Sequence, residues 1–222
     1  MTQSDGTPLA APTDAVSVAL RPYDDSAREA FAAIYEESFP ASEREDTGEL
    51  LDAVDGTRRR CYLAWVDGVP VGLAVLFRLE GPSIEFLEYF AVERGRRSRG
   101  IGAAMLAQLR PVLDGAEGVL FEVERPQDAI GAEREVRERR IAFYLRNGTT
   151  IVECAPDYRA PDLADDGKTV PYSLMWLPLA AGAPPAPAGS LLRRCVVAVL
   201  TQSYELDPDD QLVVAVADGI AC

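Results

Sequence analysis

A short segment of this chain combines four arginines with three glycines, a combination suited to binding phosphate. The segment reads Arg-Gly-Arg-Arg-Ser-Arg-Gly-Ile-Gly at residues 94–102, between an apolar run that ends at Val92 and an apolar, helix-like run. Backbone N–H groups at a helix N-terminus bind phosphate oxygens, especially where glycine keeps side chains away. Arginines add charge-assisted hydrogen bonds to the same anion. The segment therefore predicts a binding site for a phosphorylated cofactor.

The composition of the chain restricts its partners and its chemistry. The 222 residues carry a formal net charge of -14 and include no histidine. Nucleic-acid binding needs a basic face, so we expect no nucleic-acid partner. An acidic surface attracts cationic substrates. Without histidine, acid–base catalysis must use carboxylates, tyrosine, cysteine or water.

The cysteines and the N-terminus bear on metal binding and location. Cys61, Cys154, Cys195 and Cys222 are far apart and form no Cys-x-x-Cys pair. This spacing argues against a zinc site and against a disulfide framework, so we predict four thiols and no metal site. The polar N-terminus lacks the apolar core of a secretory signal, and no run approaches the ~18 apolar residues of a membrane helix. We therefore expect a cytoplasmic protein with no membrane partner.

Apolar periodicity and turn residues divide the chain into alternating helices and strands. Strands are predicted at 16–20, 61–66, 69–79, 84–92, 119–123, 151–154 and 170–177, and helices at 24–39, 47–54, 101–113 and 133–146. Asp67-Gly68 predicts a hairpin turn, and Asn147-Gly148 predicts a left-handed helix cap. We expect a mixed α/β fold whose central sheet has about six to seven strands, mostly antiparallel, flanked by helices.

The composition also predicts boundaries along the chain. Residues 1–14 indicate a disordered lead, residues 15–179 the main domain, and the Ala/Pro-rich residues 180–190 a linker. Residues 191–222 form a C-terminal extension, expected to be helical because Leu191, Cys195 and Val199 recur at helical spacing. The apolar stripe of the extension could pack on the main domain or form the interface of a homodimer.

Three interpretations compete for the arginine–glycine segment. A dinucleotide site of the Rossmann type would need a glycine where Met105 stands, and its strand would run almost directly into the first glycine. A solvated basic loop is the second interpretation. The third starts from the form R-x-x-G-x-G at residues 97–102, between a strand and a helix. Here the chain resembles the GNAT superfamily of N-acetyltransferases over residues 16–178. Phe-Tyr-Leu-Arg-Asn-Gly at 143–148 also looks like its F-Y-x-x-x-G-F signature, with a departure at the last position.

This resemblance implies a GNAT fold that binds acetyl-CoA. Strands 84–92 and 119–123 would splay apart and hold the pantetheine arm, while backbone N–H groups of the loop would contact the diphosphate. The residues implied in cofactor binding are Phe90, Ala91, Val92, Arg97, Ser98, Arg99, Gly100, Ile101, Gly102 and Ala103. Tyr144 matches the tyrosine that commonly protonates the leaving thiolate.

A carboxylate is the natural general base in this chain. By strict alternation Glu88 shares a face with Ile84, Phe86, Phe90 and Val92. Placing a carboxylate on an apolar face raises its pKa toward neutrality. A bulge in the strand would upset this alternation. Glu85, Glu122, Glu124 and a water chain are the alternatives to Glu88.

The resemblance also indicates where the acceptor would bind. Acceptor residues would lie around 39–45 and around Asp157-Tyr158, and the candidate substrate-binding residues are Glu43, Arg44, Glu85, Glu122 and Glu124. The carboxylates suggest a small cationic amine, and Arg44 could hold a substrate carboxylate. The expected function is acetyl transfer to a primary amine of a small molecule by direct attack. A protein or peptide acetyltransferase and a non-catalytic CoA-binding sensor remain as alternatives.

Overall fold

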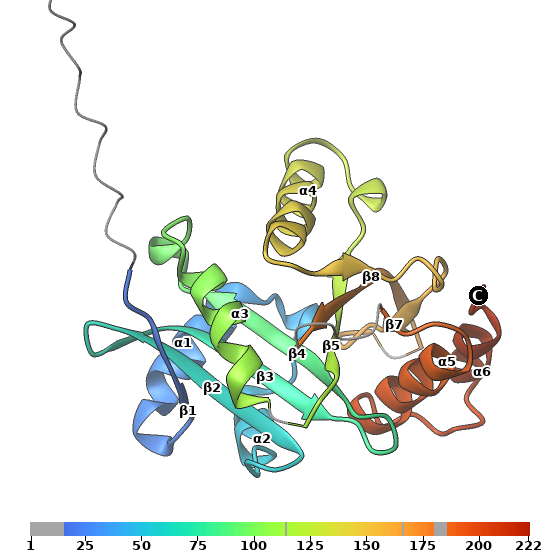
Figure 1. The fold of residues 1–222 in the computed structure, drawn as a ribbon, viewed down its shortest axis with the longest axis horizontal. Helices are drawn as coiled ribbons and strands as arrows, with labels where there is room; N and C mark the ends of the chain where they lie inside the picture. Colours follow the sequence, from blue (N-terminus) through green and yellow to red (C-terminus); the bar gives the residue numbers. More distant parts are fainter. Residues whose placement is uncertain (1–15, 114, 166, 180–185) are drawn as a thin grey trace, which may run out of the picture.

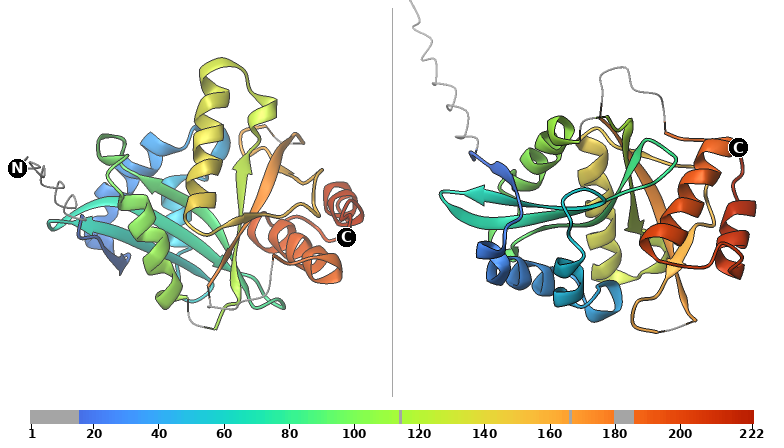
Figure 2. Two further views of the ribbon diagram at one scale, coloured as in Figure 1. Left: turned by 45° about the horizontal axis from the view of Figure 1, so that its top comes forward. Right: turned by 90° about the horizontal axis from the view of Figure 1, so that it is seen from below.

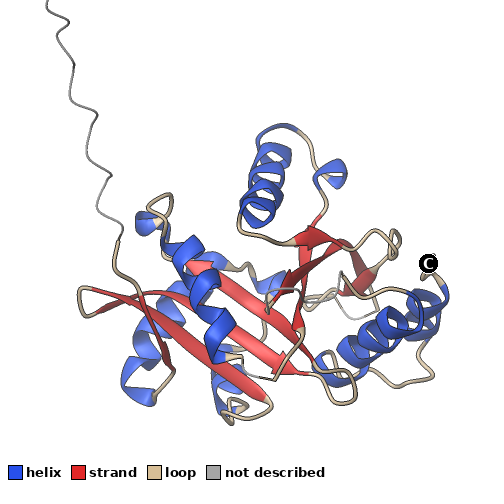
Figure 3. Cartoon of the chain, viewed as in Figure 1, coloured by secondary structure: helices blue, strands red, loops and turns tan. Residues whose placement is uncertain are grey.

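A single mixed sheet organises the chain. The computed structural model describes residues 16–113, 115–165, 167–179 and 186–222. Within these ranges the chain forms eight strands and six α-helices (Figure 1, Figure 3). The sheet order is β1-β2-β3-β4-β5-β8-β6, and β7 pairs with β8 at its side. The mixed α/β class with a mostly antiparallel sheet is confirmed, with one strand more than the predicted maximum.

The elements alternate along the chain much as predicted. The strands are β1 (Ala19–Pro22), β2 (Arg59–Val66), β3 (Val69–Arg78), β4 (Ile84–Val92), β5 (Gly118–Glu124), β6 (Thr150–Ile151), β7 (Arg159–Pro161) and β8 (Thr169–Pro178). The helices are α1 (Arg28–Ser38), α2 (Thr47–Asp52), α3 (Ile101–Val112), α4 (Gly131–Arg146), α5 (Gly189–Ala198) and α6 (Gln211–Asp218).

The contact between β4 and β5 differs from every other contact in the sheet. These two strands are parallel, whereas the other pairs are antiparallel. They pair only from Ile84 opposite Gly118 to Phe86 opposite Leu120. Beyond Phe86 none of the described strands pairs with the edge of β4 that faces β5. The predicted splay of these strands is therefore present, and it opens a gap in the sheet.

Helices cover both faces of the sheet. Phe31 and Tyr35 of α1 pack with Val75 of β3, while Leu106 of α3 packs with the neighbouring Leu76, which points to the opposite face. Figure 2 shows α1 and α3 on opposite sides of the strands in its right panel. The C-terminal helices α5 and α6 lie against the β5–β8 end of the sheet, where their apolar side chains join its core.

Several predicted boundaries need correction. The first strand begins at Ala19 rather than residue 16, and β6 (Thr150–Ile151) includes only Ile151 of the expected strand 151–154. The loop predicted for residues 155–169 contains β7, and α5 begins inside the predicted linker. The predicted lead, residues 1–14, and most of the linker lie outside the described residues.

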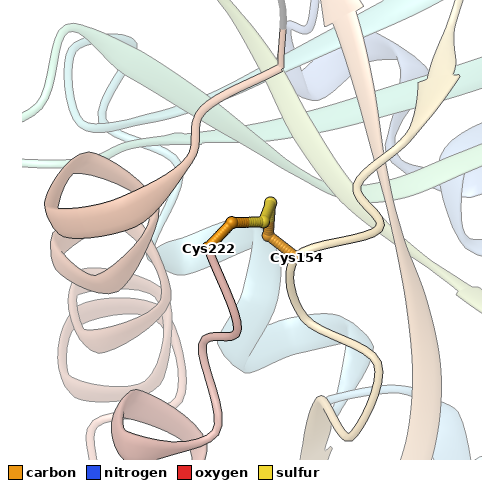
Figure 4. The surroundings of a disulfide bond; sticks show 2 residues. All are labelled: Cys154 and Cys222. Carbon is orange, nitrogen blue, oxygen red and sulfur yellow. A yellow bond between two sulfur atoms is a disulfide. The ribbon is translucent and has the colours of Figure 1, made fainter.

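The prediction of four free thiols is wrong for two of the cysteines. Cys154 and Cys222 form a disulfide with a Cα–Cα distance of 5.4 Å (Figure 4), whereas Cys61 and Cys195 are buried free thiols. The two bonded residues are 68 positions apart in the sequence. The chain after α6 returns to the segment following β6, where the Ala221 N–H also donates to the Cys154 carbonyl at 2.8 Å. The spacing of the cysteines in the sequence does not predict that Cys154 and Cys222 lie close together.

Candidate active site

The gap between β4 and β5 is the entrance to a large cavity. Its volume is about 1500 Å³. The cavity is lined by the free edge of β4, by β5, by the loop before α3, by α4 and by residues 203–206 of the C-terminal extension. Elements that are distant in the sequence thus share one internal space.

The loop before α3 presents unpaired backbone donors to this cavity. Gly100 has a φ of 81°, a left-handed conformation that side chains disfavour. The N–H of Ala104 donates to the Gly100 carbonyl, but the N–H groups of residues 98–103 have no acceptor among the described residues. At Gly102 a Cβ atom would lie 3.1 Å from Cζ of Phe143. The helix start is therefore open for an anion, as the sequence predicts.

The arginines of this loop have individual roles. Arg97 Nε donates to the Val92 carbonyl at 2.8 Å, so its side chain braces the loop against β4. Arg94 forms an ion pair with Glu37, with 3.3 Å between Nε and Oε1. Arg97 and Ser98 line the cavity, whereas Arg99 is exposed and lies outside the lining. Arg96 also lines the cavity, so two of the four guanidinium groups lie beside the backbone N–H groups of the loop.

A β-bulge places Glu88 at the mouth of the gap. Val75 of β3 lies opposite Tyr89, and Leu76 lies opposite Leu87, so Glu88 is the extra residue with no partner on β3. The bulge adds one residue to the β4 side of the ladder, and the side-chain alternation reverses beyond it.

This reversal corrects the predicted face of the strand. Ile84 and Phe86 pack in the core cluster that contains α5, and Glu88 contacts the extension on the same side. Phe90 and Val92 pack instead beside Ile101 and Met105 of α3. The predicted alternation therefore holds for the first two residues and is wrong for Phe90 and Val92.

Two hydrogen bonds hold the Glu88 carboxylate in one orientation, and in the described part of the chain its second oxygen has no partner. Arg59 Nη2 donates to Glu88 Oε1 at 2.8 Å, and Ser203 Oγ donates to the same atom at 2.7 Å. Arg59 also pairs with Glu45 at 3.0 Å. The Glu88 side chain is 5% exposed, and its Oε2 has no hydrogen-bond partner among the described residues. Because Glu88 lines the cavity, this oxygen is free to accept a hydrogen bond from a ligand.

Glu122 is held by tyrosines rather than by a cation. Tyr158 donates its hydroxyl to Glu122 Oε1 at 2.5 Å, and Tyr204 donates to Oε2 at 2.7 Å. The pKa of Glu122 is raised to about 7: burial and the charge of Glu88 raise it, and the hydrogen bonds from the two hydroxyls, which favour the ionised form, lower it. A carboxyl group that titrates near neutrality is suited to accept and release a proton.

Tyr144 lies on α4 and lines the same cavity. Its ring packs against Phe121 with a centroid distance of 4.7 Å, and also near Phe90 and Phe143. Burial raises the pKa of the Tyr144 hydroxyl to about 12, so the hydroxyl stays protonated at neutral pH. No hydrogen bond within the described residues uses it. Tyr144 can therefore donate to a ligand, as an acid requires.

The other predicted acceptor residues divide into two groups. Glu43 and Glu124 line the cavity; burial raises the pKa of Glu43, while Arg137 pairs with Glu124 at 2.9 Å. Arg44 lies outside the cavity lining. Glu85 is also outside it.

Glu85 needs correction as an acceptor residue. It is 1% exposed and forms ion pairs with Arg60 at 2.5 Å and Arg78 at 3.1 Å. Glu85 is the neighbour of Phe86 in β4, before the bulge, so the two side chains point to opposite faces of the sheet. Because Glu88 lies on the same side as Phe86, the side chain of Glu85 points away from Glu88. The structure thus places Glu85 outside the cavity.

Sequence reasoning missed three residues of the site: Arg59, Ser203 and Tyr204. Arg59 begins β2 and reaches Glu88 across the sheet. Ser203 and Tyr204 interrupt the apolar stripe of the extension with hydroxyl groups. That interruption is a signal in the sequence, but it does not reveal where the hydroxyls bind.

Comparison with known proteins identifies the family. The sequence model of the acetyltransferase (GNAT) family matches residues 25–148, more than half of the chain. The chain therefore belongs to the GNAT acetyltransferase family, and the resemblance inferred from the loop is confirmed. No curated protein matches the chain.

Solved structures share the fold at low sequence identity. A protein described as a GNAT-family acetyltransferase from Bacteroides thetaiotaomicron has a TM-score of 0.69 and 23% identity, covering 85% of this chain and 99% of that chain. The ribosomal-protein-S18-alanine N-acetyltransferase of Escherichia coli has a TM-score of 0.54 and 19% identity, with coverages of 78% and 100%. An aminoglycoside 6'-N-acetyltransferase complexed with coenzyme A has a TM-score of 0.56 and 16% identity, with coverages of 76% and 99%. At these identities the likenesses establish the fold alone.

Two further findings concern the described residues. None of their helices is both long and apolar enough to cross a membrane. No group of three or more of their cysteine, aspartate or glutamate side chains is arranged to hold a metal ion.

Proposed function

We propose that this protein is an acetyl-CoA-dependent N-acetyltransferase that acetylates the primary amine of a small cationic molecule. The observation that carries the proposal is one cavity with two chemically different ends. At one end the backbone N–H groups of residues 98–103 lack acceptors. The carboxylates Glu43, Glu88 and Glu122 line the other end. The first end suits a diphosphate, and the second suits an ammonium group.

The residues of the loop fit a coenzyme A diphosphate. The left-handed Gly100 turns the backbone N–H groups outward, and the absence of a side chain at Gly102 leaves room beside Phe143. The free edge of β4 at Phe90, Ala91 and Val92 would pair with an extended ligand chain. The coenzyme A complex of an aminoglycoside acetyltransferase with this fold supports the choice of cofactor. Bound acetyl-CoA supplies the acetyl thioester.

Glu88, Glu122 and Tyr144 have different roles in the proposed reaction. The alternation in the sequence favours Glu88 as the base, whereas the contacts favour Glu122. Glu88 forms an ion pair with Arg59 and keeps Oε2 free, so it binds the acceptor's ammonium group. Glu122, whose pKa is about 7, accepts the proton that the nitrogen must lose before it can attack. Tyr144 would then donate its hydroxyl proton to the leaving sulfur, and the second proton that the nitrogen loses on forming the amide would restore the Tyr144 hydroxyl.

Titration with acetyl-CoA tests the cofactor site. Gly100→Glu should abolish binding, because the new side chain meets a left-handed backbone and puts a negative charge on the cradle. Gly95→Glu is the matched control: it adds the same charge to the same loop, with no atom within 4 Å of its Cβ and no place in the cavity lining. If both variants bind as tightly as the parent, the diphosphate site is elsewhere.

Turnover with a panel of amines tests the reaction. Small polyamines and aminoglycosides should react faster than neutral amines or peptide N-termini. A preference for peptides would support the protein acetyltransferase alternative, and acetyl-CoA binding without any turnover would support the sensor alternative.

Two variants separate the roles of the carboxylates. Glu122→Gln should lower kcat and remove the acidic limb of the pH profile near pH 7, whereas Glu88→Gln should mainly raise KM for the amine. The reverse pattern would return the role of base to Glu88.

A further inference from the structure

The C-terminal extension reaches into the acceptor end of the cavity. After α5 the chain continues as a π-helical turn, Val199–Ser203, and then leaves the helix at Tyr204. Residues 203–206 line the same cavity as the loop before α3. π-Helical turns cost helix stability and are frequent at functional sites. Here the turn directs two consecutive hydroxyl side chains toward the sheet.

Each hydroxyl contacts a different carboxylate of the site. Ser203 Oγ donates to Glu88 Oε1 at 2.7 Å across 115 residues of sequence. Tyr204 donates its hydroxyl to Glu122 Oε2 at 2.7 Å across 82 residues. The ring of Tyr204 also lies 6.4 Å from that of Phe86, the last β4 residue that pairs with β5. The extension therefore touches both strands at the point where they part.

Three anchors fix the extension in this position. Val199 and Leu200 are fully buried in the core cluster that includes Trp176 of β8. The side chain of Gln202 accepts a hydrogen bond from the backbone N–H of Glu80 at 2.8 Å and donates to its carbonyl at 3.2 Å. The disulfide to Cys154 holds the end of the extension. Ser203 and Tyr204 are thus presented by a packed support.

We propose that Ser203 and Tyr204 are positioning residues that orient the two carboxylates of the acceptor site, so that the C-terminal extension is part of the active site. This inference rests on the proposed function. A charge-assisted hydrogen bond to each carboxylate fixes its rotamer, and the bond from Tyr204 also favours the ionised form of Glu122. Ser203 leaves Oε2 of Glu88 free, and Tyr204 shares Glu122 with Tyr158.

The charged and titratable groups around Glu122 come from several elements. Tyr158 and Tyr204 donate to it, the charge of Glu88 on β4 acts on it, and its own charge acts on Tyr172 of β8. Among these groups Tyr204 is the one that the extension supplies. Removing its hydroxyl should therefore make the ionised form of Glu122 less stable.

The test is the variant Tyr204→Phe, which keeps the ring and removes the hydroxyl. We expect the acidic limb of the kcat/KM profile to move up by about one pH unit, the shift expected for loss of one hydrogen bond to a charged group. At pH 7 this corresponds to about a fivefold loss of kcat/KM, which recovers at pH 9. Ser203→Ala should raise KM for the amine several-fold with little change in kcat.

Thr201→Val is the matched control, because its hydroxyl belongs to the same π-helical turn but donates to the Val197 carbonyl. Thr201→Val should leave the acidic limb of the kcat/KM profile and the KM for the amine unchanged. The Glu122 carboxyl can also be titrated by carbon-13 NMR, with its signal assigned by its loss in Glu122→Gln. This measurement needs no turnover, so it separates failure of this inference from failure of the proposed function. An unchanged Glu122 midpoint in Tyr204→Phe would overturn the inference, as would equal effects of Ser203→Ala and Thr201→Val on KM.

Discussion

The raised pKa of Glu122 makes folding stability depend on pH in a way that one substitution can isolate. The pKa of this carboxyl is raised from its ordinary value of 4.5 to about 7. A difference of one pKa unit corresponds to about 1.4 kcal/mol, so the whole shift amounts to at most about 3 kcal/mol. The cavity admits water, which is why this figure is an upper bound. Glu122→Gln removes the titration and keeps the shape of the side chain.

The sign of the effect follows from proton binding. Between pH 4.5 and 7 the folded protein keeps a proton on Glu122 that the unfolded chain has lost. The contribution of Glu122 is therefore fully present below pH 4.5 and is lost as the pH rises through 7. The glutamine variant has no such loss. Its stability relative to the parent should increase by up to about 3 kcal/mol between pH 4.5 and pH 8.5.

Thermal unfolding of both proteins over this pH range measures the difference. For a chain of this size 1 kcal/mol shifts Tm by about 2–4 °C, so the gap between variant and parent should widen by up to about 10 °C. Burial also raises the pKa values of Glu43 and Glu45, but both residues are present in both proteins and cancel in the comparison. A gap that stays constant across the range would show that Glu122 titrates normally, and the case for Glu122 as the base would lose its support.

Three other perturbations have defined outcomes. Cys222→Ser should lower the free energy of unfolding by about 2–4 kcal/mol, because the bond to Cys154 closes a long loop; added reductant should then destabilise the parent but not the variant. Gly118→Ala should cost about 1–3 kcal/mol in urea unfolding, since its Cβ would overlap the Trp176 ring; an unchanged midpoint would mean that the ring moves aside. Tyr144→Phe should slow acetyl transfer about a hundredfold with acetyl-CoA affinity retained, whereas loss of affinity alone would assign it a packing role.

The parts of the site that the sequence predicted are local in the chain. The hairpin turn at Asp67-Gly68 has both residues at positive φ, 51° and 78°, as that dipeptide favours. Gly100 likewise adopts a left-handed conformation just before α3. In each case neighbouring residues decide the backbone, so the pattern is sufficient.

The errors arise where distant segments meet. Alternation along β4 fails at Glu88 because the register is set by pairing with β3, which the strand's own sequence does not contain. Glu85 is a carboxylate on the predicted strand, as expected of an acceptor-binding residue. In the structure it pairs with Arg60 and Arg78 on the face of the sheet opposite to Glu88. Charge and residue type do not reveal the partner of a side chain.

The sequence by itself determined the family, the order of the elements and the open helix start at Gly100, since these depend on residues a few positions apart. Which groups surround Glu88 and Glu122 depends on the folded chain. It brought Ser203 to Glu88 across 115 residues, Tyr204 to Glu122 across 82, and Cys222 to Cys154 across 68. The physical reason is that burial of the extension's apolar residues against the sheet sets these contacts, and burial depends on the whole core rather than on any local pattern.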